Sequence, residues 1–194
     1  MEASVLGAGI VRLRIDDETE LRQTAIGDAA AILAMVQPCR DHLAQHIPLY
    51  DAWRTAVDVE GMLGAWDAQH EAVGSLYAGI WQNGDCLGLV SLEIFDKVDG
   101  LAAIGFTVAR RCEGTSLAFR ASERLLKYAF EEAGARRIFA RTTTANARAQ
   151  KLLLRLGFLK EGVLREALKL RGQYVDLDTF ALLQHEWVEA HRPV

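Results

Sequence analysis

Apolar and polar residues alternate along several short segments of this chain, which is the pattern of β-strands with one buried face. The turns between them carry the usual turn residues, as at Asn83, Gly84 and Asp85. The predicted strands are 10–15, 19–25, 75–81, 86–95, 102–109, 137–142, about 164–169 and 174–183.

Other segments repeat their apolar residues every three or four positions, which predicts amphipathic helices. In segment 116–133 such a repeat forms one apolar stripe, and Gly134 is a suitable end. The predicted helices are 28–35 with Asp28 as N-cap, a short helix between Pro38 and Pro48 carrying His42 and His46, 56–66 with Val57, Met62 and Leu63 facing inward, 116–133, and 147–156. This order of elements predicts an α/β sandwich with a mixed sheet.

The composition supports one folded domain over residues 1–194, with 51% hydrophobic and 25% charged residues. A net charge of −4 without a basic block argues against nucleic-acid binding. The three cysteines lack metal-ligand spacing, so we expect no metal site. No apolar run approaches the ~18 residues of a membrane helix, and residues 1–4 do not start a signal peptide. We therefore expect a soluble cytoplasmic protein that does not bind membranes.

The most informative segment is 104–116, which reads as a strand running into a glycine loop that opens a helix. Such a loop directs backbone N–H groups at one point, where the helix dipole adds partial positive charge. That arrangement suits a phosphate or pyrophosphate. Gly114 by itself could serve only to shape a turn, so the inference depends on a second set of residues.

A second set of motifs follows the loop. The motifs are the loop Arg111-x-x-Gly114-x-Ser116, then Asn146-x-x-Ala149, Leu156–Gly157–Phe158, Glu161–Gly162, a late Asp176 and a closing Glu186–Trp187. Together they resemble the acetyl-CoA-dependent N-acetyltransferases of the GNAT superfamily, and within it the RimJ/RimL type. The resemblance extends from about Ile15 to Trp187 and implies the GNAT fold, α/β with a mostly antiparallel central sheet flanked by helices.

The resemblance also implies acetyl-CoA as cosubstrate, CoA as product, and a set of residues that bind it. The strand backbone at Phe106, Thr107 and Val108 would face the thioester, and Asn146 would reach the pantetheine arm. The residues that would hold the pyrophosphate are Arg111, Cys112, Glu113, Gly114, Thr115 and Ser116. Asn146 could also serve only as the N-cap of its helix.

Three positions depart from the family pattern. Ser116 replaces a glycine or alanine, but it is small enough to let the backbone approach a phosphate. Glu113 places a negative charge in the anion loop, which should weaken CoA binding unless its side chain points to solvent. Ala149 replaces a serine proposed to protonate the CoA thiolate. A thiol pKa near ~8.5 makes the thiolate a tolerable leaving group without that serine.

The candidate catalytic residues are Asp96 and Asn146. Asp96 precedes the central strand at the distance where related enzymes place a carboxylate near the amine, with Glu93 and Asp99 as alternatives. A solvated hairpin turn is the competing interpretation of Asp96. The family's glutamate just before Ile104 is Ala103 here, so that base is missing.

We expect the acceptor amine to bind near His46, Tyr50 and Trp53, although aromatic residues beside a proline can also be packing residues. A weak base favours an α-amine, with a pKa of roughly 7.7–8.0, over a lysine amine near ~10.4. The sequence therefore predicts acetyl transfer to a protein N-terminus, ribosomal or other, by direct attack in a ternary complex. The alternatives are a small amine acceptor (an antibiotic, polyamine or amino acid) and a CoA-binding module with impaired catalysis. Resemblance alone makes a homodimer plausible.

Overall fold

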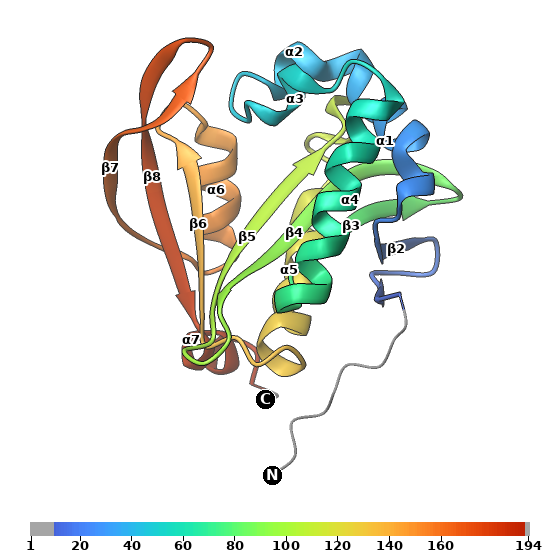
Figure 1. Ribbon diagram of the computed structural model, residues 1–194. Coiled ribbons are helices and arrows are strands. Elements are labelled where there is room, and N and C mark those ends of the chain that lie inside the picture. The colour runs from blue at the N-terminus through green and yellow to red at the C-terminus, as the bar shows by residue number, and fades with distance from the viewer. Residues whose placement is uncertain (1–9, 193–194) are drawn as a thin grey trace.

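The computed structural model of this chain describes residues 10–192, so the expectation that rests on residues 1–4 lies outside it. Its strands form one eight-stranded sheet in the order β1-β2-β3-β4-β5-β6-β8-β7 (Figure 1). The strands are β1 (Arg12–Arg14), β2 (Thr19–Gln23), β3 (Leu76–Gln82), β4 (Asp85–Asp96), β5 (Leu101–Val108), β6 (Arg137–Thr143), β7 (Leu159–Leu170) and β8 (Gln173–Leu183). Only β5 and β6 pair in parallel; the other neighbouring strands are antiparallel.

Helices cover both faces of the sheet. They are α1 (Ala29–Val36), α2 (Arg40–Leu43), α3 (Leu49–Ala52), α4 (Ala56–Val73), α5 (Leu117–Glu131), α6 (Ala147–Arg155) and α7 (Gln184–Ala190). On one face, α1, α3 and α4 bury a core that includes Ile32, Trp53 and Leu63. On the other, α5 and α6 bury a core that includes Leu125 and Leu153. None of these helices is both long and apolar enough to span a membrane.

The sheet opens between its two central strands. Residues 101–103 of β5 pair with residues 137–139 of β6, whereas β4 follows β5 as far as Val108 and β8 follows β6 as far as Thr143. Beyond Ala103 the two strands therefore diverge, as Figure 1 shows toward the top of the view. The edge of β5 that faces the gap carries backbone groups that the described part of β6 does not pair, and these groups are available to a ligand.

The predicted fold is confirmed, and the errors lie in particular elements. The helix predicted over 56–66 continues to Val73, and Val57 does not face inward but is 71% exposed. Asp28 holds the N-cap position of α1 without a capping hydrogen bond, because its carboxylate pairs with Arg22. His46 lies beyond the end of α2. Neither α3 nor α7 was predicted, and β7 begins at Leu159 rather than near 164.

Candidate functional site

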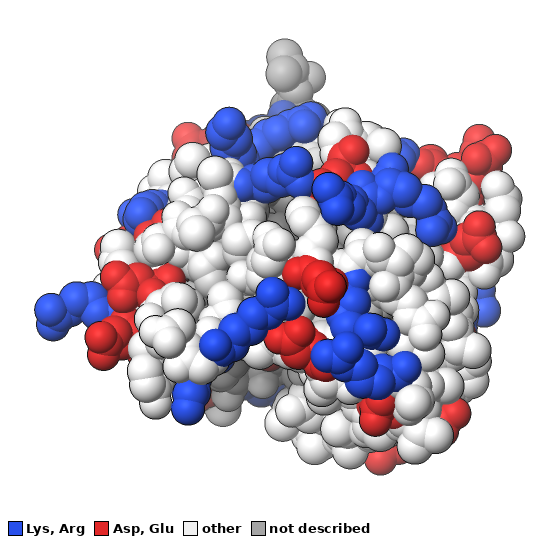
Figure 2. Space-filling view, turned by 90° about the horizontal axis from the view of Figure 1, so that it is seen from above, with Lys and Arg blue, Asp and Glu red and all other residues white. Residues whose placement is uncertain are grey.

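A cavity of about 710 Å³ lies beside the part of β5 that has diverged from β6, at residues 106–108. Its walls come from the segment around His42 and His46, the end of β5, the loop that follows β5, the first turn of α5, and one side of α6. In Figure 2, which looks down on this end of the molecule, acidic and basic side chains interleave across the surface. The cavity therefore joins the predicted phosphate loop and the predicted acceptor segment in one site.

The loop after β5 has the geometry of an anion site. A short 3-10 turn (Arg110–Cys112) leads to Gly114 and Ser116, which both have positive φ, of 78° and 63°. Ser116 is the N-cap of α5, yet within the described residues no side chain caps that helix, so its first N–H groups stay free for a ligand. A Cβ at Gly114 would meet only open space. A pyrophosphate therefore fits against this loop.

The cationic side chains of the cavity add to that fit, with one correction to the prediction. Arg110 lines the cavity, whereas Arg111 does not. Thr115 also lies off the cavity, and its hydroxyl donates to the carbonyl oxygen of Cys112. Arg148, Lys151 and Arg155 line the cavity from α6. The anion site thus draws its positive charge from α6 as well as from the loop, a feature that the loop motif alone could not indicate.

Glu113 does not point freely to solvent, and its charge is compensated. Its carboxylate pairs with Nε2 of His42 at 2.5 Å and with the guanidinium of Arg148. The Arg148 pair connects the loop after β5 to α6, across the opening of the gap. The expected loss of CoA affinity is therefore reduced, because an arriving phosphate meets a neutralised carboxylate and a nearby guanidinium.

Asn146 performs the capping role and also lines the cavity. Its Oδ1 accepts the backbone N–H of Ala149 at 3.1 Å, which satisfies one free donor at the start of α6. A contact from Asn146 to a ligand would therefore come from its NH₂ group. Ala149 lines the same cavity with a methyl group, which has no proton to give.

His46 is the predicted acceptor residue that the structure places in the cavity. Its Nδ1 lies 2.9 Å from Oγ1 of Thr143, at the end of β6. Partial burial, and then repulsion from His42, lower the pKa of His46 below its ordinary value. The imidazole is therefore neutral at pH 7, with one ring nitrogen fixed by the threonine.

Tyr50 and Trp53 belong to the core and not to the cavity wall, which corrects the prediction that they bind substrate. They are 3% and 1% exposed, and their rings pack edge-to-face at 5.3 Å. The Tyr50 hydroxyl bonds to Thr107, which does line the cavity, and burial raises the pKa of Tyr50. Both residues therefore support the wall from behind.

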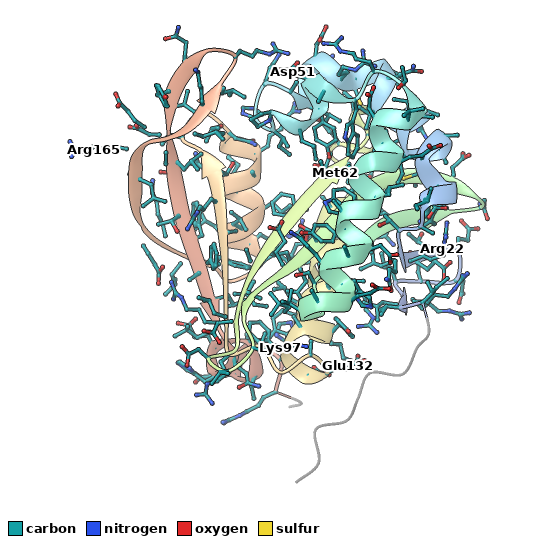
Figure 3. All side chains as sticks on the ribbon, viewed as in Figure 1. Arg22, Asp51, Met62, Lys97, Glu132 and Arg165 are labelled. Carbon is teal, nitrogen blue, oxygen red and sulfur yellow. The ribbon has the colours of Figure 1, made fainter. Side chains whose placement is uncertain are left out.

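Asp96 lies at the wrong end of the sheet to act as the base. It pairs with Leu101, seven positions before Val108 on β5, which at ~3.3 Å per residue is roughly 20 Å away along the strand. Its Oδ1 accepts the backbone N–H groups of Val98 and Asp99, so the hairpin-turn interpretation holds. Figure 3 shows the neighbouring Lys97 at the opposite end of the molecule from Asp51 of α3.

The two alternative bases are also outside the cavity. Asp99 is in the same turn as Asp96. Glu93 lies on β4 opposite Ala103 and accepts the Ser91 hydroxyl at 3.2 Å.

Sequence reasoning also missed a contact between the β7–β8 hairpin and the α2–α3 segment. Arg171, at the tip of the β7–β8 hairpin, lies 3.3 Å from Asp51 and 3.9 Å from Asp41. These pairs connect the hairpin to the segment that carries His46. Arg171 and Asp51 are 120 positions apart in the sequence, so no local pattern could have indicated their contact.

Comparison with known proteins places these features in a family. The family described as "Acetyltransferase (GNAT) domain" matches residues 19–159. A putative ribosomal N-acetyltransferase, YdaF of Bacillus subtilis, is 32% identical over 128 residues, covering 66% of this chain and 70% of the relative. The spermidine N(1)-acetyltransferase of Escherichia coli is 26% identical over 110 residues, covering 57% of this chain and 59% of the relative. RimL, a ribosomal L7/L12 α-N-protein acetyltransferase solved with coenzyme A, superposes with a TM-score of 0.84 at 17% identity, covering 89% of this chain and 98% of that one.

Proposed function

Since the chain belongs to the GNAT acetyltransferase family, and is therefore an N-acetyltransferase that uses acetyl-CoA, we propose that its acceptor is the α-amino group of a protein N-terminus. The relative YdaF, named as a putative ribosomal N-acetyltransferase, supports a ribosomal protein as one such acceptor. A ribosomal acceptor would place the reaction in the cytoplasm.

This proposal rests on which charged side chains line the cavity. Of the described residues that line it, Glu113 is the one acidic side chain, and both of its oxygens are paired. A lysine amine, with a pKa near ~10.4, needs a strong base to lose its proton, whereas an α-amine near ~7.7–8.0 is already partly neutral at pH 7. A cavity without a free carboxylate therefore suits the α-amine.

The same cavity supports the proposal of direct transfer without an acyl-enzyme. With the pyrophosphate at the N-terminus of α5, the pantetheine arm would enter the gap between β5 and β6, next to the unpaired edge of β5. A backbone N–H on that edge would stabilise the negative charge that develops on the thioester oxygen. Holding both reactants together makes the attack effectively unimolecular.

A polyamine acceptor is the second candidate, because of two acidic residues on the α2–α3 segment, which also carries His46. Asp41 is 93% exposed in its side chain, and Asp51 is 36% exposed and shares Arg171. A cation could displace Arg171 from this pair. The spermidine acetyltransferase relative supports the same alternative.

The test is a rate comparison with three acceptors at equal concentration. They are a lysine-free peptide with a free N-terminus, the same peptide with a blocked N-terminus and one lysine, and spermidine. Release of the CoA thiol gives the rate, and mass spectrometry identifies the acetylated atom. We expect the free α-amine to react fastest. Faster acetylation of the lysine peptide or of spermidine would overturn the proposed acceptor, and CoA binding without turnover of any amine would favour the impaired module.

A further inference from the structure

The acetyl transfer proposed above leaves two proton transfers without a residue to perform them. The attacking amine must lose a proton, and the departing CoA thiolate must gain one. Asp96 lies at the far end of the sheet, and Ala149 offers the cavity only a methyl group. The cavity must therefore supply both proton transfers from another group.

We propose that His46 accepts the proton that the attacking amine loses and then returns it to the CoA thiolate. The inference rests on the proposed acetyl transfer, and it concerns a residue whose only earlier expectation was contact with the acceptor. His46 would act as a catalytic residue, because its imidazole faces the cavity in which the reacting atoms must lie.

The hydrogen bond to Thr143 anchors one ring nitrogen of His46 and is compatible with the tautomer that this role needs. When Nδ1 carries the hydrogen, it donates to Oγ1 of Thr143 at 2.9 Å, and Nε2 keeps a free lone pair. Thr143 is 4% exposed and ends β6, so this anchor is held by the sheet. One ring nitrogen is thus held by the protein while the other can exchange a proton.

The charges around His46 favour its neutral form. The charged or titratable groups that share the cavity are His42 on its own segment, Arg110, Cys112 and Glu113 on the loop after β5, and Arg148, Lys151 and Arg155 on α6. Thr107, which lines the cavity at the end of β5, and Thr143, which bonds His46 from the end of β6, are uncharged. Glu113 is held by His42 and Arg148. Desolvation and the repulsion from His42 both lower the pKa of His46, which keeps it a base at neutral pH.

In the proposed reaction, the proton that leaves the amine is the same proton that the CoA thiolate gains, and it is carried by His46. The amine nitrogen attacks the thioester carbon and forms the C–N bond, and its surplus proton passes to Nε2 of His46. The C–S bond then breaks, and the sulfur leaves with the electron pair as a thiolate. The imidazolium returns the proton to the thiolate, giving the N-acetylated product, CoA thiol and neutral His46. This return is downhill, because a thiol pKa near ~8.5 exceeds the imidazole value near ~6.5.

The test combines activity with two readouts that need no acceptor. The variant His46→Asn keeps a polar atom near the place of Nδ1, so it can still bond Thr143, but it lacks Nε2. The matched control is His185→Gln, because His185 is an exposed histidine on α7 that does not line the cavity. For each protein we would measure kcat against pH with whichever amine the wild type acetylates, CoA affinity by calorimetry, and the His46 ring signals by NMR.

We expect His46→Asn to lower kcat by about 100-fold, the usual contribution of a general base. CoA affinity should stay close to the wild-type value, and His185→Gln should behave as the wild type. In the wild type, kcat should rise with pH through the pKa of His46, and this limb should vanish in His46→Asn. A variant that keeps the wild-type kcat and pH profile would overturn the proposal.

The NMR readout separates failure of this inference from failure of the proposed acceptor. The His46 ring signal should titrate below ~6.5, and it should shift when CoA fills the cavity. If peptides are not acetylated but spermidine is, the acceptor proposal fails while the kcat comparison still tests His46. If no amine reacts, a His46 signal that does not change on saturation with CoA overturns the inference.

Discussion

The two halves of the cavity are built in different ways. The CoA half comes from one run of chain, in which the end of β5, the glycine loop and the first turn of α5 follow one another. The acceptor half brings together the α2–α3 segment, the end of β6 and the β7–β8 hairpin, joined by His46–Thr143 and Arg171–Asp51. A phosphate site can therefore be encoded locally, whereas the acceptor site exists only after the whole sheet has formed.

The largest expected effect concerns Trp53, which the structure moves from the acceptor half to the core. Trp53→Ala should lower the free energy of unfolding by about 3–5 kcal/mol, because it leaves a large cavity in the core shared by α1, α3 and α4. Denaturant unfolding measures this. Trp53→Phe should cost much less and leave the acceptor KM unchanged. A raised KM in a fully stable Trp53→Phe would instead return Trp53 to the acceptor site.

The next effect concerns the CoA half alone. Gly114→Trp should weaken CoA binding by more than about 100-fold, because blocking two charge-assisted N–H contacts removes roughly 1.5–3 kcal/mol each. Calorimetric titration measures the change. Gly114→Ala is the matched control, because it shares the positive φ of 78° but adds only a methyl group in open space. Equal loss in both variants would mean that backbone strain, and not the blocked loop, weakens binding.

A smaller effect should be confined to the acceptor half of the cavity and leave the CoA half unchanged. Arg171→Ala should raise the acceptor KM by only a few-fold, since an exposed ion pair holds the hairpin weakly. CoA affinity should not change. Arg165→Ala is the control, on the same hairpin and pointing away from the molecule in Figure 3. An effect on CoA affinity rather than on KM would show that the two halves are not independent.

The smallest expected effect concerns the Glu113 carboxylate, whose charge is compensated by Arg148. Glu113→Gln removes a negative charge from the phosphate loop and releases Arg148 to bind the ligand, so CoA should bind up to about fivefold tighter. The acceptor KM should stay the same. The difference should shrink at high salt, because the charges are partly exposed. Weaker binding of CoA to Glu113→Gln would show that the Glu113–Arg148 pair helps to form the site.

The sequence was sufficient for the features that local patterns determine. The strand–loop–helix around Gly114 and the cap at Asn146 follow from turn, cap and periodicity signals, and both occur in the structure. Asp96 was misplaced because its motif spacing says nothing about which end of β4 faces the cavity. Thr143 and Arg148 were missed because their partners, His46 and Glu113, are 97 and 35 positions away. Such contacts depend on tertiary packing.

The most direct test of the central claim is a crystal structure of the protein with CoA. We predict the pyrophosphate at the N–H groups of Ser116, Leu117 and Ala118, with the pantetheine arm between β5 and β6. We also predict that Arg148 turns from Glu113 toward a phosphate. CoA bound outside this gap, or a gap closed by continuous β5–β6 pairing, would contradict the account.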